Sequence, residues 1–191
     1  IVRPTVDGLV ADGLPYRGFL YFGIMLTPDG PRILEYNCRF GDPECQAVLP
    51  LIEGDFASYC AQGAKGKISR DLIGFREGWS VCVILASAGY PATSHSGDHI
   101  SGFDNLSNTT RLYHAGTKLG ERGAFETAGG RVLAVVCHRS TREEAVEAAH
   151  AAADCIHFEG LQDAGTLVYF ILRVIDRKVL RESNDISSLK F

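Results

Sequence analysis

The sequence lacks the features that would place it in a membrane or on a nucleic acid. Its longest apolar stretches, Val81–Ala86 and Leu167–Leu172, are about a third of the roughly 20 residues that a membrane-spanning helix needs. The 19 Lys and Arg residues are scattered and are outnumbered by 23 Asp and Glu, giving a net charge of -4, so no basic surface is expected to follow a phosphate backbone. We therefore expect neither a membrane nor a nucleic acid as a partner.

The cysteines lack the spacing of a metal or redox site. No Cys-x-x-Cys occurs, and several cysteines lie inside apolar segments, where free thiols pack as small hydrophobic side chains. We predict reduced, buried cysteines and a cytoplasmic protein. The start, Ile1-Val2-Arg3-Pro4, also lacks an initiating Met, a charged n-region and an apolar h-region. We therefore expect the chain to be a piece of a longer protein.

The residues that are present predict an α+β protein in two parts. The 191-residue chain is 46% hydrophobic and 22% charged, which is ordinary for a soluble globular protein with a packed core. We expect one domain over residues 1–70, a second over residues 71–165, and a divergent tail over residues 166–191. The apolar run in the tail is expected to leave an unpaired strand edge.

Hydrophobic spacing and turn residues predict the secondary structure of both parts. In the first part the predicted elements are a helix over residues 3–12, strands over 18–26 and 31–37, and helices over 44–51 and 56–63. In the second they are strands over 79–87 and 131–137, short β segments around 100 and 111–114, and a helix over 141–155. The first two strands form a hairpin with apolar residues on both faces, so it is expected to be buried and covered. Asp55 is the expected N-cap of the helix over 56–63.

The densest group of polar side chains lies at the end of the second strand of this hairpin. Alternate residues of a strand share a face, so Glu35 and Asn37 point the same way. Mg²⁺ prefers hard oxygen ligands and takes one or two from protein, with phosphate and water completing its shell. Arg39 would follow on the same side if the strand continued, and it offers a fork for a phosphate or carboxylate. From these residues alone, a ligand site and a surface ion pair at a sheet edge are equally good interpretations.

Other candidate residues have structural explanations of similar weight. Asp42 as N-cap and Glu44 in the first turn are ordinary chemistry for a helix start. The run Gly129-Gly130-Arg131 could bring backbone amides and a guanidinium to a phosphate, although turn chemistry alone explains a Gly-Gly pair before a strand. His114 is more often a packed histidine than a ligand, and Tyr90-Pro91 indicates a turn with an aromatic plug.

The run Arg39-Phe-Gly-Asp-Pro-Glu-Cys-Gln46 resembles the signature of the phosphoribosylamine–glycine ligases, which belong to the ATP-grasp superfamily. The preceding segments Gly23–Leu26 and Leu34–Asn37 are similar to that family's approach to the signature. Further matching segments are Ala88–Pro91, Tyr113–Thr117, Gly129–Leu133 and Phe158–Gly160. The resemblance therefore covers most of the chain, roughly residues 5–160.

The resemblance implies that residues 1–70 form the C-terminal part of an ATP-grasp domain and that residues 71–165 form the ligase C-terminal domain. It implies a reaction that joins glycine to 5-phosphoribosylamine through glycyl phosphate, with ATP as co-substrate and Mg²⁺ or Mn²⁺ as cofactor. The implied roles are metal binding for Glu35 and Asn37, catalysis for Arg39, and substrate binding for Asp42, Glu44, Gly130 and Arg131.

Two departures from the family pattern leave a second hypothesis open. The family's N-terminal domain and nucleotide-clamping segments would precede Ile1, so the chain alone is expected to be inactive and to need those domains as partners. After Gly160 the residues no longer follow the family. The alternative is a non-catalytic module that keeps the ATP-grasp fold, and a third hypothesis is another carboxylate–amine ligase of the same superfamily.

Overall fold

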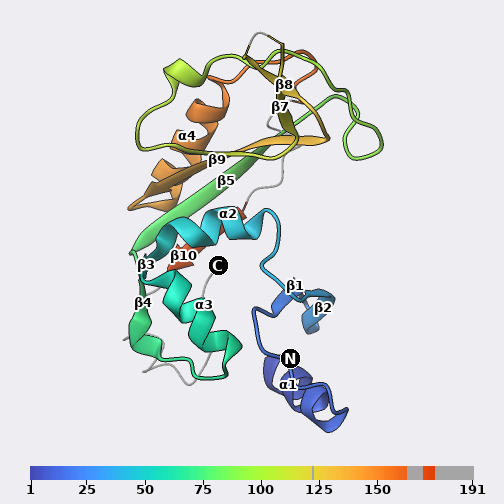
Figure 1. Ribbon diagram of the computed structural model, residues 1–191, viewed down its shortest axis with the longest axis vertical. Coiled ribbons are helices and arrows are strands. Elements are labelled where there is room, and N and C mark those ends of the chain that lie inside the picture. Colours follow the sequence, from blue (N-terminus) through green and yellow to red (C-terminus); the bar gives the residue numbers. More distant parts are fainter. Residues whose placement is uncertain (122, 163–169, 175–191) are drawn as a thin grey trace. The chain divides into compact units, whose positions relative to one another are not determined.

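The chain folds into two compact units, which the computed structural model describes over residues 1–121, 123–162 and 170–174 (Figure 1). Unit 1 comprises Ile1–Cys45 and Ile52–Gly74, and unit 2 comprises Gln46–Leu51 and the described residues from Phe75 onward. Both units contain helices and strands, so the predicted α+β class is confirmed. The predicted domain bounds at residues 70 and 165 remain predictions.

Unit 1 is built from a helix, a hairpin and a second helix flanked by short strands. Its elements are α1 (Val2–Ala11), β1 (Tyr21–Thr27), β2 (Gly30–Asn37), the start of α2 (Glu44–Val48), β3 (Ile52–Gly54), α3 (Phe56–Ala64), the 3-10 turn η2 (Arg70–Leu72) and β4 (Ile73–Phe75), which pairs with β3. The predicted N-cap is confirmed, since the Asp55 carboxylate accepts hydrogen bonds from the amide and the hydroxyl of Ser58 at 2.9 and 2.6 Å.

The helix predicted over residues 44–51 is shorter than expected. Helix α2 ends at Val48, and the 3-10 turn η1 (Leu49–Leu51) follows it. Pro50 lies in this turn, and a proline in a continuing helix would remove a backbone hydrogen bond and collide with the preceding turn. The chain then enters β3 instead of continuing as a helix.

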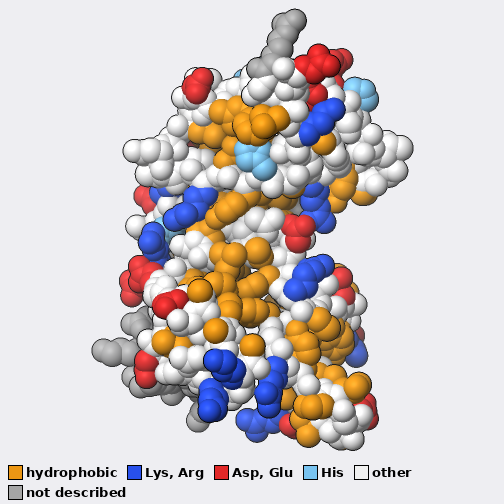
Figure 2. Space-filling model, in the orientation of Figure 1, with side chains coloured by type: hydrophobic (Ala, Val, Ile, Leu, Met, Phe, Trp, Pro, Cys, Tyr) orange, Lys and Arg blue, Asp and Glu red, His pale blue; other side chains and the backbone are white. Residues whose placement is uncertain are grey.

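The hairpin of β1 and β2 is exposed, contrary to the prediction that it would be covered. The side chains of Leu26 and Leu34 are 67% and 63% exposed, and in the described part of the chain the hairpin is a two-stranded sheet. Helix α1 also has no buried residue. Figure 2 shows such hydrophobic side chains on the surface of unit 1. Apolar residues on both faces therefore do not imply burial within this chain.

Unit 2 contains a four-stranded antiparallel sheet in the order β10-β5-β9-β6. Its strands are β5 (Gly78–Ala86), β6 (Arg111–His114), β9 (Arg131–Arg139) and β10 (Phe170–Val174). Residues 81–86 of β5 and 132–137 of β9 are all buried, because helix α4 (Arg142–Ala153) packs on both strands (Figure 1) and other segments cover the sheet. The largest core side chains include Leu85, Leu133 and Ile156.

The remaining elements of unit 2 lie between β5 and β9 in sequence. They are a 3-10 turn, η3 (Phe103–Asn105), and a small hairpin of β7 (Thr117–Leu119) and β8 (Phe125–Thr127). The β structure predicted around residue 100 consists of two isolated bridges, His99 to Glu126 and Ser101 to His157. Helix α4 begins with a capping box in which Thr141 and Glu144 exchange hydrogen bonds.

The strand edge expected in the tail is found at β10. Phe170–Val174 pairs with β5 and is the outermost strand of the sheet, so within the described residues its other side has no strand partner. The rest of the predicted tail, residues 166–169 and 175–191, lies outside the described residues.

All six cysteines are free, as predicted, but only two of them are buried. Cys82 and Cys137 lie in β5 and β9, whereas Cys38 is exposed. Cys38 follows the end of β2, where the exposed hairpin offers it no apolar packing. Among the residues that the structure describes, no helix has the length and hydropathy to cross a membrane.

Candidate functional site

Glu35 and Asn37 meet on one face of the hairpin, at the end of β2. The Asn37 Nδ2 donates a hydrogen bond of 3.2 Å to Glu35 Oε1, so the two side chains leave the strand on the same side. A half-turn of the amide brings Asn37 Oδ1 to the same place, and the two orientations look alike in most structures. The pair can thus present one carboxylate and one amide oxygen to a hard cation.

Gly23 creates the space in which the Glu35 side chain lies. The two residues face each other across the strands, and the register shifts directly after Gly23, so that Ile24 is opposite Ile33. A Cβ atom built on Gly23 would lie 2.8 Å from Glu35 Cγ, which is closer than side-chain carbons pack. The glycine therefore allows the Glu35 side chain to lie over β1.

Tyr21 joins this face from the neighbouring strand and links it to helix α2. It lies opposite Asn37, and its hydroxyl donates a hydrogen bond of 2.8 Å to Glu44 Oε1. Burial, that hydrogen bond and the negative charges of Glu44 and Glu35 raise the pKa of Tyr21 to about 12. The strand pairing with Asn37 and the hydrogen bond to Glu44 therefore bring Tyr21 into contact with both β2 and α2. Sequence reasoning missed Tyr21 and Gly23, whose only signal was their place on the strand opposite the acidic residues.

The signature residues up to Cys45 lie in the same unit but take different positions. Strand β2 ends at Asn37, so alternation does not carry Arg39 to the face of Glu35, and the exposed Arg39 guanidinium donates to the Phe40 carbonyl at 2.7 Å. Asp42 is exposed, while Gly41 and Pro43 are buried around it. The Glu44 carboxylate lies over Gly41, where a Cβ would collide with it. The structure thus brings together Glu35 and Asn37, with Glu44 reaching Tyr21 beside them.

Gly130 and Arg131 lie in unit 2, at the turn that leads into β9. The Arg131 Nε donates a hydrogen bond of 2.8 Å to the hydroxyl of Tyr90. Ser87 holds the turn in place, since its amide donates to the Gly130 carbonyl at 2.8 Å and its hydroxyl to the Gly129 carbonyl at 3.1 Å. No local pattern predicted that Tyr90, expected in a turn, contacts Arg131.

The loop after β5 also carries an ion pair between His95 and the buried Asp98. The His95 Nδ1 lies 2.8 Å from Asp98 Oδ2, and the Thr127 hydroxyl donates to the same oxygen at 3.1 Å. The hydrogen bond from His95 lowers the pKa of Asp98, and the same bond, together with the carboxylate charge, raises the pKa of His95. Sequence reasoning missed this pair, which fastens the loop to the end of β8.

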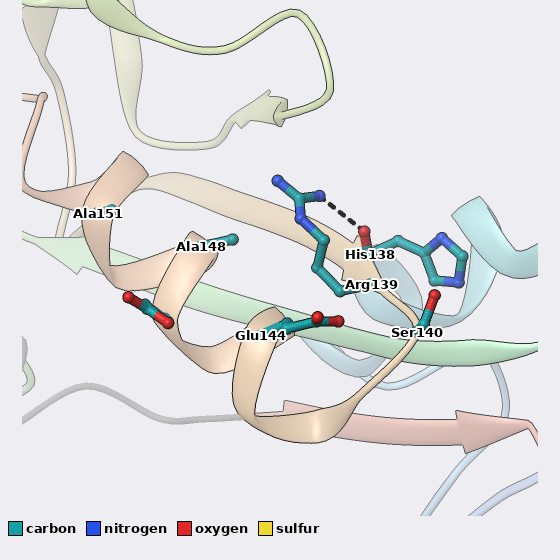
Figure 3. A pocket seen from close by; sticks show the side chains of 7 residues that line it. His138, Arg139, Ser140, Glu144, Ala148 and Ala151 are labelled. Carbon is teal, nitrogen blue, oxygen red and sulfur yellow. Dashed lines mark hydrogen bonds between the residues drawn. The ribbon is translucent and has the colours of Figure 1, made fainter.

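A separate depression lies where β9 meets α4 and contains none of the predicted site residues (Figure 3). Its volume is about 620 Å³, and it is lined by His138, Arg139, Ser140, Glu144, Glu147, Ala148 and Ala151. Two of its charged groups have structural partners: Arg139 donates to the His138 carbonyl at 2.7 Å, and Glu144 completes the helix cap. Among the described residues, no group of three or more His, Cys, Asp or Glu side chains could hold a metal ion.

Comparison with known proteins shows the family to which this fold belongs. The model of the phosphoribosylglycinamide synthetase ATP-grasp (A) domain matches residues 1–45, and the model of the C domain of the same enzyme matches residues 80–163. A phosphoribosylamine–glycine ligase from Caulobacter vibrioides is 41% identical over 162 residues, which are 84% of this chain and 38% of the relative. The chain belongs to the phosphoribosylamine–glycine ligase family.

Other relatives of the family agree in sequence and fold. A bifunctional purine biosynthetic protein of Pichia angusta is 43% identical over 83% of this chain and 20% of its own length. The crystal structure of the phosphoribosylamine–glycine ligase of Thermotoga maritima superposes with a TM-score of 0.69 at 36% identity, covering 82% of this chain and 38% of that one. The chain thus spans well under half the length of these relatives. The ATP-grasp match contains Glu35, Asn37, Arg39, Asp42 and Glu44, and the C-domain match contains Gly130 and Arg131.

Proposed function

We propose that this chain is the C-terminal portion of an ATP-dependent ligase that joins glycine to 5-phosphoribosylamine, giving glycinamide ribonucleotide, ADP and phosphate. The observation that supports it most is the contact between Glu35 and Asn37 on one strand face, in a chain that belongs to this ligase family. ATP-grasp enzymes in general use ATP and Mg²⁺. The cytoplasmic location expected from the sequence belongs to the same proposal.

Glu35 and Asn37 are the proposed ligands of a Mg²⁺ or Mn²⁺ ion. A carboxylate and an amide oxygen two residues apart are a hard donor set, and so few protein ligands suit a cation that shares its shell with nucleotide phosphates. When bound, such a cation neutralises phosphate charge during phosphoryl transfer. Glu35 supplies the negative charge of the site, and Gly23 leaves its side chain free to lie across the hairpin.

The remaining residues take roles around the transferred group and the substrates. Arg39, exposed just beyond β2, is proposed to turn from the Phe40 carbonyl to the phosphoryl group of glycyl phosphate, whose charge a guanidinium fork matches. Asp42 and Glu44 shape the loop beside the hairpin and position substrate. Gly130 and Arg131 are proposed to bind the 5-phosphate of phosphoribosylamine, since Arg131 offers a positive charge at a fixed place on β9.

The experiment is a reconstituted enzyme in which this chain follows the N-terminal segment that the Caulobacter vibrioides relative has and this chain does not span. ADP formation that requires both glycine and phosphoribosylamine is the expected result, whereas the chain alone should show no glycine-dependent ATP hydrolysis. Glu35→Ala should remove activity without loss of folding. The matched control is Asp29→Ala, which deletes another exposed carboxylate at the turn of the same hairpin and should leave activity unchanged.

The same experiment distinguishes the non-catalytic alternative. A reconstituted protein that folds and binds ATP but forms no ADP would favour an interaction module that retains the ATP-grasp fold. Full activity in Glu35→Ala would reject Glu35 as a metal ligand but would leave the ligase proposal standing.

A further inference from the structure

Tyr90 and Arg131 form a pair that joins the loop after β5 to the first residue of β9. The Arg131 Nε donates to the Tyr90 hydroxyl at 2.8 Å, and the guanidinium carbon lies 6.0 Å from the centre of the Tyr90 ring. The two residues are 41 positions apart in the sequence and both are half-buried. The hydrogen bond through Nε therefore restricts the rotamers that the half-buried Arg131 side chain can adopt.

Tyr90 itself is held from several sides. Its amide donates to the Ser87 carbonyl at 3.2 Å, and its carbonyl accepts a hydrogen bond of 3.2 Å from Gln162 Nε2. Its ring lies against Gly130, where a Cβ atom would be only 3.0 Å from Tyr90 Cε2. The glycine at position 130 is thus needed for the position of the tyrosine ring as well as for the turn. One position of the ring gives one position of its hydroxyl.

The loop that carries Tyr90 and the turn that carries Arg131 are also fastened at a second place. Thr127 precedes the Gly-Gly turn, and its carbonyl accepts a hydrogen bond of 2.8 Å from the Gly97 amide. Its amide in turn donates to the Asp98 carbonyl at 2.9 Å. Together with the contacts of Ser87, these bonds tie the loop after β5 to the segment that leads into β9.

We propose that Tyr90 is a positioning residue that orients Arg131 for the 5-phosphate of the substrate. The inference rests on the proposed function, which assigns phosphate binding to Arg131. A guanidinium recognises phosphate through a planar fork, so its orientation decides how many hydrogen bonds it makes. A guanidinium that is already oriented loses less side-chain entropy when the phosphate binds. Tyr90 acts on the substrate through Arg131.

The first measurement is the ¹⁵N NMR signal of the Arg131 Nε–H group in the 191-residue chain. Tyr90→Phe deletes only the hydroxyl, so this signal should shift and its exchange with water should become faster. Tyr113→Phe is the matched control, because it deletes a hydroxyl from β6 in the same unit and should leave the signal unchanged. An unchanged Arg131 signal in Tyr90→Phe would overturn the inference.

The second measurement is the affinity of the chain for ribose 5-phosphate, which shares the ribose and phosphate of phosphoribosylamine. Loss of one hydrogen bond to Arg131 should raise Kd by about 2- to 10-fold in Tyr90→Phe. In an Arg131→Lys background, the same change should have no further effect, because the two residues act as one unit. Equal affinity in Tyr90→Phe and the wild-type chain, or an equal additional loss in the Arg131→Lys background, would overturn the inference.

Failure of the phosphate role is distinguishable from failure of the ligase proposal. A wild-type chain that does not bind ribose 5-phosphate would overturn both phosphate binding by Arg131 and this inference. Such a result would not affect the metal role of Glu35, which the activity of the reconstituted enzyme tests separately.

Discussion

At the scale of single residues, the candidate site depends on two residues of β1, Gly23 and Tyr21, that no sequence motif identifies as functional. The alternation of side chains along a strand predicted that Glu35 and Asn37 share a face, and their hydrogen bond agrees with this geometry. The contributions of Gly23 and Tyr21 could not be predicted, because they depend on the register between the strands and on the return of Glu44 to the hairpin. Arg39 was expected on the shared face only if the strand continued, and β2 ends at Asn37, so alternation makes no prediction for its side chain.

Gly23→Ala should weaken metal binding without unfolding the hairpin. The added Cβ would lie 2.8 Å from Glu35 Cγ, so the Glu35 side chain must move away from the face that it shares with Asn37. We expect the concentration of Mg²⁺ needed for half-maximal activity of the reconstituted enzyme to rise about 10-fold, as the loss of one charged hydrogen-bonding interaction would produce. A magnesium titration of the activity measures this.

The control for Gly23→Ala is Gly74→Ala on β4. An added Cβ there meets nothing closer than 4.0 Å, so the magnesium dependence should remain that of the wild type. An unchanged magnesium dependence in Gly23→Ala would show that the position of Glu35 is unimportant for the metal.

The Tyr21 hydroxyl should titrate near pH 12, well above the ordinary value of about 10 for tyrosine. Because the folded state raises this pKa, the stability contributed by the protonated hydroxyl is complete below about pH 10 and is lost as the pH rises toward 12. Glu44→Gln removes one of the charges that raise the pKa, so its Tyr21 should titrate closer to 10. The difference between the ultraviolet titration curves of the wild type and Tyr21→Phe isolates the ionisation of Tyr21. A Tyr21 that titrates near 10 in the wild type would contradict the contact with Glu44.

At the scale of elements, local sequence patterns predicted the long helices and strands and missed the short ones. The capping residues Asp55 and Thr141 and the apolar runs of β5 and β9 are local signals, and all of them appear in the structure. The three-residue strands β3 and β4 pair from separate segments, and β7 and β8 form a small hairpin; all four are too short for an alternating pattern to mark them. The apolar run in the tail did mark a strand where β10 lies, but its pairing with β5 is a long-range contact that no local pattern predicts.

Thr141→Ala should destabilise helix α4 by about 1 kcal/mol, the usual effect of removing an N-cap side chain. The Thr141 hydroxyl accepts a hydrogen bond of 3.3 Å from the Glu144 amide, and the Glu144 carboxylate accepts one of 3.3 Å from the Thr141 amide. Urea unfolding followed through the amide signals of α4 measures the change. Thr141→Ser keeps the hydroxyl and should retain most of the stability. Equal stability of the alanine and wild-type proteins would show that the capping box is not needed.

At the scale of the whole molecule, the two units differ in how many apolar side chains they bury. The main cluster of buried side chains belongs to unit 2, centred on β5, β9 and α4. In unit 1, by contrast, neither α1 nor α3 has a buried residue, and the hairpin exposes Leu26 and Leu34. Because apolar burial is the main favourable term in folding, unit 1 should be the less stable unit of this chain.

Hydrogen exchange of the 191-residue chain should therefore show two levels of protection. The amides of β5 and β9 should exchange slowly and those of the β1–β2 hairpin much faster, since protection follows local stability. In the reconstituted enzyme, the hairpin amides should become more protected while those of β5 and β9 change little. Equal protection of both units in the chain alone would contradict the difference in core.

The central claim is that Glu35 and Asn37 hold one metal ion between them. The most direct measurement is the anomalous X-ray signal of Mn²⁺ in crystals of the reconstituted enzyme with ADP. We predict a manganese peak about 2.0 to 2.3 Å from a Glu35 carboxylate oxygen and from Asn37 Oδ1, as expected for a hard cation with oxygen ligands. A manganese ion bound to the nucleotide with both of these side chains outside its coordination shell would contradict the claim.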